Sequence, residues 1–190
     1  HLDDADIDLL ADNEVNVVHC PQSNLKLASG MCRVSDLSKA GVNICVGTDG
    51  AASNNDLNLL DEMQTAALLA KGVANDPSAL DARHALDMVT INGARALGMG
   101  DELGSIQAGK HADLCAIDLA HPRTQPLHHV ISQIVYAAAS DQVTDVWVAG
   151  QRLLENRELT TMDEESILDK ANHWAQRMRP EIREREAVST

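Results

Sequence analysis

The chain has 190 residues, of which 44% are hydrophobic, enough for one good domain or about one and a half small ones. Its formal net charge of −14 argues against a nucleic acid or an anionic membrane as a partner. With no Phe, one Tyr and two Trp, the core must be built from aliphatic residues and Met, and no run approaches the roughly 18 apolar residues of a membrane span.

Helices and strands alternate at the start of the chain. Residues 3–13 and 34–40 predict helices, and each is followed by an apolar run that predicts a strand, at 15–19 and at 42–46. Residues 20–30 predict a loop, because a proline stands early in this segment and a glycine late. Short links between alternating helices and strands are the signature of parallel β/α units.

Two longer helices are expected next. Residues 56–72 carry apolar side chains at helical spacing. The run Ser78-Ala-Leu-Asp81 matches a capping box, which predicts a second helix that starts there and continues towards Leu97.

The pattern then changes to that of β hairpins. Apolar runs at 112–117 and 143–148 predict strands, and Gly150-Gln151 predicts a tight turn after the second of them. The capping-box pattern Thr161-Met-Asp-Glu164 predicts a terminal helix with an apolar stripe, followed by a frayed tail after Pro180.

The four cysteines, at positions 20, 32, 45 and 115, form no CxxC pair. Three of them lie in or beside apolar runs. This pattern predicts reduced, mostly buried thiols in a cytoplasmic protein rather than a disulfide framework.

Asp49 is the strongest candidate for chemistry. The apolar run 42–46 stops at Gly47 and delivers this acid between Thr48 and Gly50. A carboxylate at the C-terminal tip of a buried strand is where an α/β barrel places a metal ligand or a catalytic base, and we expect a dry, rigid setting. Composition alone leaves open the alternative of a turn aspartate, since Asp-Gly is common in turns.

His19 closes the preceding strand and is expected to point towards the same edge, where it could contact a substrate. The alternative is a structural histidine. Ser23, Asn24 and Lys26 follow on the next loop, and their position alone makes them candidates for lining the site.

Other chemistries find no support. The sequence has no P-loop, no GxGxxG after a strand and no GxSxG nucleophile elbow. His128-His129 looks like a paired metal motif, but adjacent residues rarely face one ion on a regular element, which favours a loop feature. The cysteines form no zinc knuckle, and the histidines without a partner at metal-ligand spacing are His84, His111, His121 and His173.

Two segments carry a family resemblance. The runs His19-Cys-Pro-Gln-Ser-Asn-Leu-Lys-Leu-Ala-Ser-Gly30 and Gly47-Thr-Asp-Gly-Ala-Ala-Ser-Asn-Asn55 closely resemble the amidohydrolase superfamily. Within it they are most similar to the aminohydrolase branch that includes the 5-methylthioadenosine/S-adenosylhomocysteine deaminases, with triazine chlorohydrolases and guanine deaminases as near relatives. The run Leu103-Gly-Ser-Ile-Gln-Ala-Gly-Lys-His-Ala-Asp-Leu114 also resembles these enzymes, where it marks the return from the barrel to a small β-sandwich.

The resemblance implies an α/β fold in three parts. Residues 1–100 would be the C-terminal βα units of a (β/α)8 TIM barrel, residues 101–160 part of a small β-sandwich, and residues 161–190 a C-terminal helix and tail. It also implies one divalent metal ion, usually zinc. By motif Asp49 is the aspartate after the eighth strand, which in the family binds the metal and accepts a proton from the attacking water.

The other family ligands and the proton-shuttling glutamate find no counterpart here. His1 matches the second histidine of a family motif, His-x-x-His-Leu, whose first histidine is the functional one, so no role is carried over to it. The chain also does not begin with Met, and we therefore expect an N-terminal part outside this sequence. Two strands cannot close a barrel and one carboxylate is a poor zinc site, so the 190 residues alone are expected to do neither.

The function implied is a metal-dependent hydrolytic deaminase of an amino-purine nucleoside. Asp49 would be its catalytic and metal-binding residue, and Asp49 and His19 would contact the small-molecule substrate. One alternative is a triazine chlorohydrolase or guanine deaminase type of hydrolase. Another is a non-catalytic fragment or interaction module, and homo-oligomerisation stays open.

Overall fold

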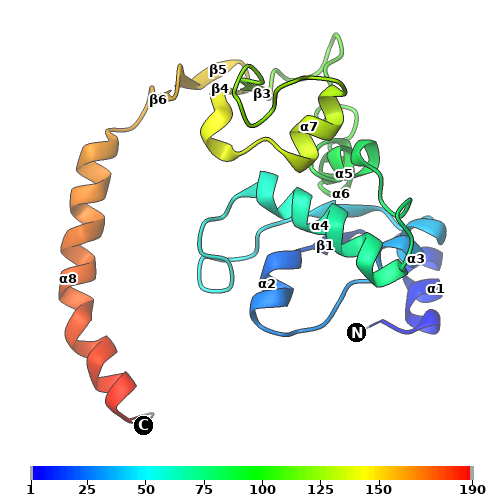
Figure 1. Cartoon of the computed structure of the whole chain (residues 1–190), viewed down its shortest axis with the longest axis horizontal. Coiled ribbons are helices and arrows are strands. Elements are labelled where there is room, and N and C mark those ends of the chain that lie inside the picture. The colour runs from blue at the N-terminus through cyan, green and yellow to red at the C-terminus, as the bar shows by residue number, and fades with distance from the viewer. Residues whose placement is uncertain (1, 189–190) are drawn as a thin grey trace.

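The structure is a computed structural model that describes residues 2–188, with side chains up to Met178. It is a mixed α/β arrangement in which two small sheets and several helices form a body, and helix α8 stands apart from that body (Figure 1). Within the described span, no helix combines the length and the apolar character that crossing a membrane requires.

The β/α alternation predicted for the start of the chain is confirmed. Strands β1 (Val17–His19) and β2 (Ile44–Val46) pair in parallel. Each strand follows a helix, α1 (Asp4–Asp12) or α3 (Val34–Lys39). The Asp3 side chain caps α1 by accepting a hydrogen bond from the backbone of its first turn, as a capping box does.

The loop predicted for residues 20–30 is wrong in its first half. Residues Pro21–Lys26 form a short helix, α2. Pro21 occupies the first helical position, where its missing N–H has no helical partner to lose and its fixed φ suits the helix. Proline therefore starts a helix here instead of marking a loop.

Strand β2 lies at the centre of the main core. All of its side chains are buried, and helices α3, α4 (Leu59–Ala74), α5 (Ala82–Met88) and α6 (Ile91–Ala96) pack against it. The buried members of this cluster are aliphatic or Met, as the composition predicted. They are Ile7, Val34, Leu37, Val42, Ile44, Val46, Ala66, Ala70 and Met88. A smaller cluster joins α4 and α5 to α7 (Val130–Tyr136), a helix that the sequence pattern did not predict.

The helix start predicted at Ser78 is misplaced. The N-cap is Asp81, whose side chain accepts a 2.9 Å hydrogen bond from the His84 backbone N–H. Ser78 instead donates to the Asp76 carboxylate within the preceding loop. The expected single helix is also two, because the chain leaves helical geometry at Thr90 before α6 begins.

The predicted hairpins form one antiparallel sheet in chain order. Its strands are β3 (Leu114–Ile117), β4 (Val143–Val148), β5 (Gln151–Glu155) and β6 (Glu158–Leu159). The β4–β5 turn consists of Ala149 and Gly150, one residue earlier than predicted. Their φ angles of 50° and 79° are the positive values that a tight hairpin turn of this type requires.

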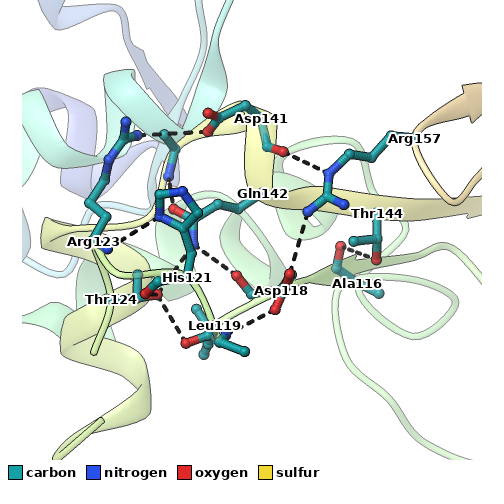
Figure 2. A network of polar contacts seen from close by, with 12 residues as sticks. Ala116, Asp118, Leu119, His121, Arg123, Thr124, Asp141, Gln142, Thr144 and Arg157 are labelled. Carbon is teal, nitrogen blue, oxygen red and sulfur yellow. Dashed lines mark hydrogen bonds and ion pairs between the residues drawn. The ribbon is translucent and has the colours of Figure 1, made fainter. Parts of the chain in front are cut away.

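Gln142, just before β4, ties this sheet to the segment after β3 (Figure 2). Its buried side-chain amide donates to the Asp118 carbonyl at 2.8 Å and to the Thr124 hydroxyl at 3.3 Å. Arg157, beyond β5, donates to the Asp141 carbonyl at 2.9 Å and lies 3.5 Å from the Asp118 carboxylate. These contacts tie the irregular segment to the sheet.

Helix α8 (Glu164–Val188) is capped by Asp163, whose side chain accepts a 3.1 Å hydrogen bond from the Ser166 backbone N–H, and not by Thr161 as the capping-box pattern predicted. Its backbone stays helical through Pro180, so the frayed tail predicted there is not seen up to Val188. The predicted apolar stripe is present but exposed, since Ile167 is 44% and Trp174 55% accessible.

The four cysteines are all free, in agreement with the absence of a disulfide framework. Their burial agrees with the prediction only in part. Cys45 on β2 is buried, Cys20 and Cys32 are half-buried, and Cys115 on β3 is exposed.

Candidate functional site

Asp49 lies on the loop that follows β2, at the C-terminal edge of the parallel pair, as predicted. The dry setting expected for it is wrong for the described residues, because Asp49 is exposed. Its φ of 62° is in the left-handed region, which costs a non-glycine residue about 1–2 kcal/mol, although aspartate tolerates it better than most. A strained acid held in place at a strand end is a reason to look for function there.

Three hydrogen bonds fix the Asp49 carboxylate. Oδ2 accepts from the Ser53 hydroxyl at 2.6 Å and from the Ser23 hydroxyl at 2.8 Å, and Oδ1 accepts from the Gly50 backbone N–H at 2.8 Å. These donors hold the pKa of Asp49 below its usual value, with Ser53 the largest cause. A carboxylate offers about four acceptor positions, so one position remains, on Oδ1.

His19 and Asp49 line one open cavity of about 320 Å³, together with residues that include Asn24, Met31 and Arg33. The residues that line the cavity come mainly from β1, from the segment between the two strands and from the loop after β2. Its size is at the lower end of the range for small-molecule sites. The structure therefore brings together the two residues that the sequence singled out.

The His19 side chain is almost completely buried, with 3% of its surface accessible. Burial lowers the pKa of this imidazole to about 4, so the ring is neutral at pH 7. A neutral imidazole can donate or accept a hydrogen bond but does not offer a positive charge to a ligand.

The three loop candidates have different surroundings. Ser23 holds Asp49, and Asn24 lines the cavity. The Lys26 ammonium donates to the Ala52 carbonyl at 2.9 Å and to the Asn55 side chain at 2.5 Å. Both acceptors lie on the loop after β2, so these bonds tie Lys26 to the loop that carries Asp49.

Glu62 on α4 is a further residue near the site that the sequence patterns did not indicate. It is fully buried, and its carboxylate accepts hydrogen bonds from the Gln22 backbone N–H at 3.1 Å and from the Asn54 side-chain amide. Burial is the main cause that raises the pKa of Glu62. Its spacing was the available signal, because Glu62 precedes Ala66 and Ala70 at helical intervals on the buried face.

The residues described do not make a complete metal site. Within residues 2–178 no group of three or more His, Cys, Asp or Glu side chains is arranged to hold a metal ion. Catalytic zinc usually has three protein ligands, and Asp49 supplies one carboxylate. His129 of the paired histidines is the N-cap of α7, where its ring nitrogen accepts from the Ser132 backbone at 3.1 Å. His1 lies outside the described residues.

Comparison with known proteins gives consistent matches. A sequence model of the amidohydrolase family matches residues 1–153. The 5-methylthioadenosine/S-adenosylhomocysteine deaminase of Teredinibacter turnerae is 49% identical over 173 residues, which are 91% of this chain and 39% of that protein.

Solved structures agree. The crystal structure of an adenosine deaminase from Xanthomonas campestris with bound zinc superposes with a TM-score of 0.93 at 55% identity, over 95% of this chain and 41% of that one. An atrazine chlorohydrolase from Arthrobacter aurescens, complexed with zinc, superposes with a TM-score of 0.84 at 29% identity, over 91% of this chain and 38% of that one. The chain thus spans about two fifths of the length of the relatives it matches.

Proposed function

This chain belongs to the amidohydrolase family, whose sequence model covers residues 1–153, and on that premise we propose that it is part of a hydrolytic deaminase of amino-purine nucleosides, of the 5-methylthioadenosine or S-adenosylhomocysteine type. The observation that carries the proposal is Asp49, fixed by three hydrogen bonds at a strand end and open to a cavity of small-molecule size. The 49% identity to a deaminase of that name supports the substrate class.

The parts of the mixed α/β arrangement can be assigned to two domains of the family fold as a proposal. We propose that β1 and β2 with their helices are the last two βα units of a (β/α)8 barrel within residues 1–100. The antiparallel sheet would then be part of a β-sandwich within 101–160, and 161–190 a C-terminal helix and tail. Within residues 2–188 the barrel is not closed, because β1 and β2 pair only with each other. The TM-score of 0.93 supports this assignment.

We propose zinc as the metal, because the adenosine deaminase relative holds it. A zinc ion supplies a Lewis acid and lowers the pKa of a coordinated water towards about 7. Asp49 would contribute one ligand through Oδ1, the oxygen with a free acceptor position, and the remaining ligands would come from outside the described residues.

In the proposed reaction water adds to the ring carbon that bears the amino group, and ammonia leaves. Asp49 is the proposed acceptor of the water proton. Its lowered pKa keeps the carboxylate ionised and ready to bind, and the same hydrogen bonds make it a weaker base. The proton would therefore stay on it only briefly before passing to the leaving amine through a group outside this chain.

His19 is a proposed substrate contact. Its neutral ring at the cavity can exchange a hydrogen bond with an uncharged purine. A small-molecule substrate and a cytoplasmic location complete the proposal.

A substrate panel tests this function. The full-length protein that carries this chain, loaded with zinc, is assayed for ammonia release from 5-methylthioadenosine, S-adenosylhomocysteine and guanine, and for chloride release from atrazine. Ammonia release from the purine nucleosides is expected. Chloride release alone would favour the triazine hydrolases, to which the 29% identity is a weaker pointer. Inactivity on the whole panel would favour a non-catalytic module.

A further inference from the structure

Glu62 joins the two segments that hold Asp49. Its Oε2 accepts from the Gln22 backbone N–H, and Gln22 directly precedes Ser23. Its Oε1 accepts from the Asn54 side chain, and Asn54 directly follows Ser53. One buried carboxylate therefore fixes the neighbours of both serines that donate to Asp49.

We propose that Glu62 is a positioning residue that orients the Asp49 carboxylate by holding helix α2 and the loop after β2 in register through Gln22 and Asn54. This rests on the role proposed for Asp49. Helix α4 is the platform, since it packs against α2 (Figure 1) and its Thr65 hydroxyl accepts a second bond, 3.1 Å long, from the Gln22 side chain.

The hydrogen-bonding pattern requires an acceptor at both oxygens of residue 62. The Gln22 backbone offers only a donor. The Asn54 amide must also present its NH2 group, because its oxygen accepts from the Leu57 backbone N–H at 3.0 Å. Only a carboxylate meets two donors at once, whereas a glutamine would place an NH2 group against one of them.

The complete burial of Glu62 argues against a role that is limited to filling space in the core. Glu62 has no accessible surface, and Asn54 is 2% accessible. Burying a carboxylate is costly unless its hydrogen bonds are made, and an apolar residue would fill the same space without that cost. The two acceptor oxygens are therefore what distinguishes Glu62 from an apolar residue at this position.

The test is a donor–acceptor swap. Glu62→Gln breaks one of the two bonds, and Asn54→Asp alone sets two carboxylates against each other. In the double variant Asn54→Asp/Glu62→Gln, the carboxylate at position 54 accepts from the new amide at position 62 and from the Leu57 N–H. The amide oxygen at position 62 accepts from the Gln22 N–H, so every donor again has an acceptor.

The variants are made in the full-length protein that carries this chain. Three quantities are measured: kcat and KM for ammonia release from 5-methylthioadenosine, bound zinc, and hydrogen exchange of residues 20–27 and 47–58. Each single variant is expected to lower kcat about 10- to 100-fold, with a smaller change in KM, and to speed exchange in both segments. The double variant is expected to regain most of the lost kcat and the protection. Asp61→Asn, the same charge change one residue away, is the control and should leave kcat unchanged.

Wild-type kcat in a folded Glu62→Gln variant would overturn the positioning role while leaving the deaminase assignment intact. So would a double variant that regains protection of both segments but keeps the low kcat of the single variants. If the wild-type protein released no ammonia, the proposed function would fail. Hydrogen exchange would then be the only test of the positioning role of Glu62. Protection lost in the single variants and regained in the double one would support the positioning role, and unchanged protection would refute it.

Discussion

The Ser23 hydroxyl donates a 2.8 Å hydrogen bond to Oδ2 of Asp49, and this bond joins two βα units across 26 residues of sequence. Ser23 lies on α2 after β1, and Asp49 lies on the loop after β2. The carboxyl ends of parallel strands meet at one edge, so a side chain from each unit can reach the other. The carboxylate is thus oriented from both units.

Ser53→Ala should raise the pKa of Asp49, because the Ser53 hydroxyl is the largest cause of its depression. A carboxyl with a depressed pKa stabilises the fold above its unfolded pKa and loses that contribution as the pH falls through its folded value. The variant should therefore lose less stability on acidification, over a narrower pH range that still begins near the unfolded pKa of Asp49. Titration of the Asp49 carboxyl carbon by NMR measures this shift. Ser53→Thr keeps a hydroxyl and serves as the control, and equal pKa values in the alanine variant and the wild type would contradict the assignment.

Gly104→Ala should destabilise the fold far more than Gly109→Ala. Both glycines have positive φ, 81° and 93°. A Cβ at Gly104 would lie 2.7 Å from the Ile91 Cα and 2.9 Å from the Ala94 Cβ, whereas at Gly109 nothing lies within 4 Å.

The backbone term alone should cost Gly109→Ala about 1–2 kcal/mol of unfolding free energy. Gly104→Ala should lose about 1–3 kcal/mol more through overpacking against α6. Urea denaturation of the two variants measures the difference. Equal losses would mean that the contact with α6 is not tight.

The sequence was most informative where one local signal decided the structure. Apolar runs identified β1 and β2, and the abrupt stop of the second run at Gly47 placed Asp49 at a strand end. Local patterns failed where two signals competed. Pro21 reads equally as a loop residue and as the first residue of a helix, and α2 depends on its packing against α4.

The hydrogen-bond partners of Asp49 could not be predicted from local sequence patterns. Ser23 was a candidate by position only, and nothing in its surroundings pointed to a carboxylate 26 residues away. The link between Glu62 and Gln22 spans 40 residues and depends on how two helices pack. The dry setting expected for Asp49 was wrong for the same reason, because the burial of a residue at a strand end depends on which distant segments cover that end.

The buried His19 should make stability fall as the pH drops below 6.5. The unfolded chain binds a proton at this residue near pH 6.5, but the folded chain only at about pH 4. Between these values the unfolded state binds more protons, so the fold loses up to about 3 kcal/mol as the pH falls through that window.

His19→Gln lacks this titration, so its unfolding free energy should fall less between pH 7 and pH 4. The raised pKa of Glu62 acts in the opposite direction, but it is present in both proteins and cancels in the comparison. Denaturation curves at a series of pH values measure the difference. Parallel pH profiles for the two proteins would show that His19 is not held neutral.

Asp49→Asn in the full-length protein that carries this chain tests most directly whether Asp49 is a metal ligand and proton acceptor. The substitution keeps the size of the side chain and removes its charge. The measurement is ammonia release from 5-methylthioadenosine, with bound zinc determined on the same sample. We predict that turnover falls at least about 100-fold and that the zinc content drops. Wild-type turnover with wild-type zinc content would contradict it.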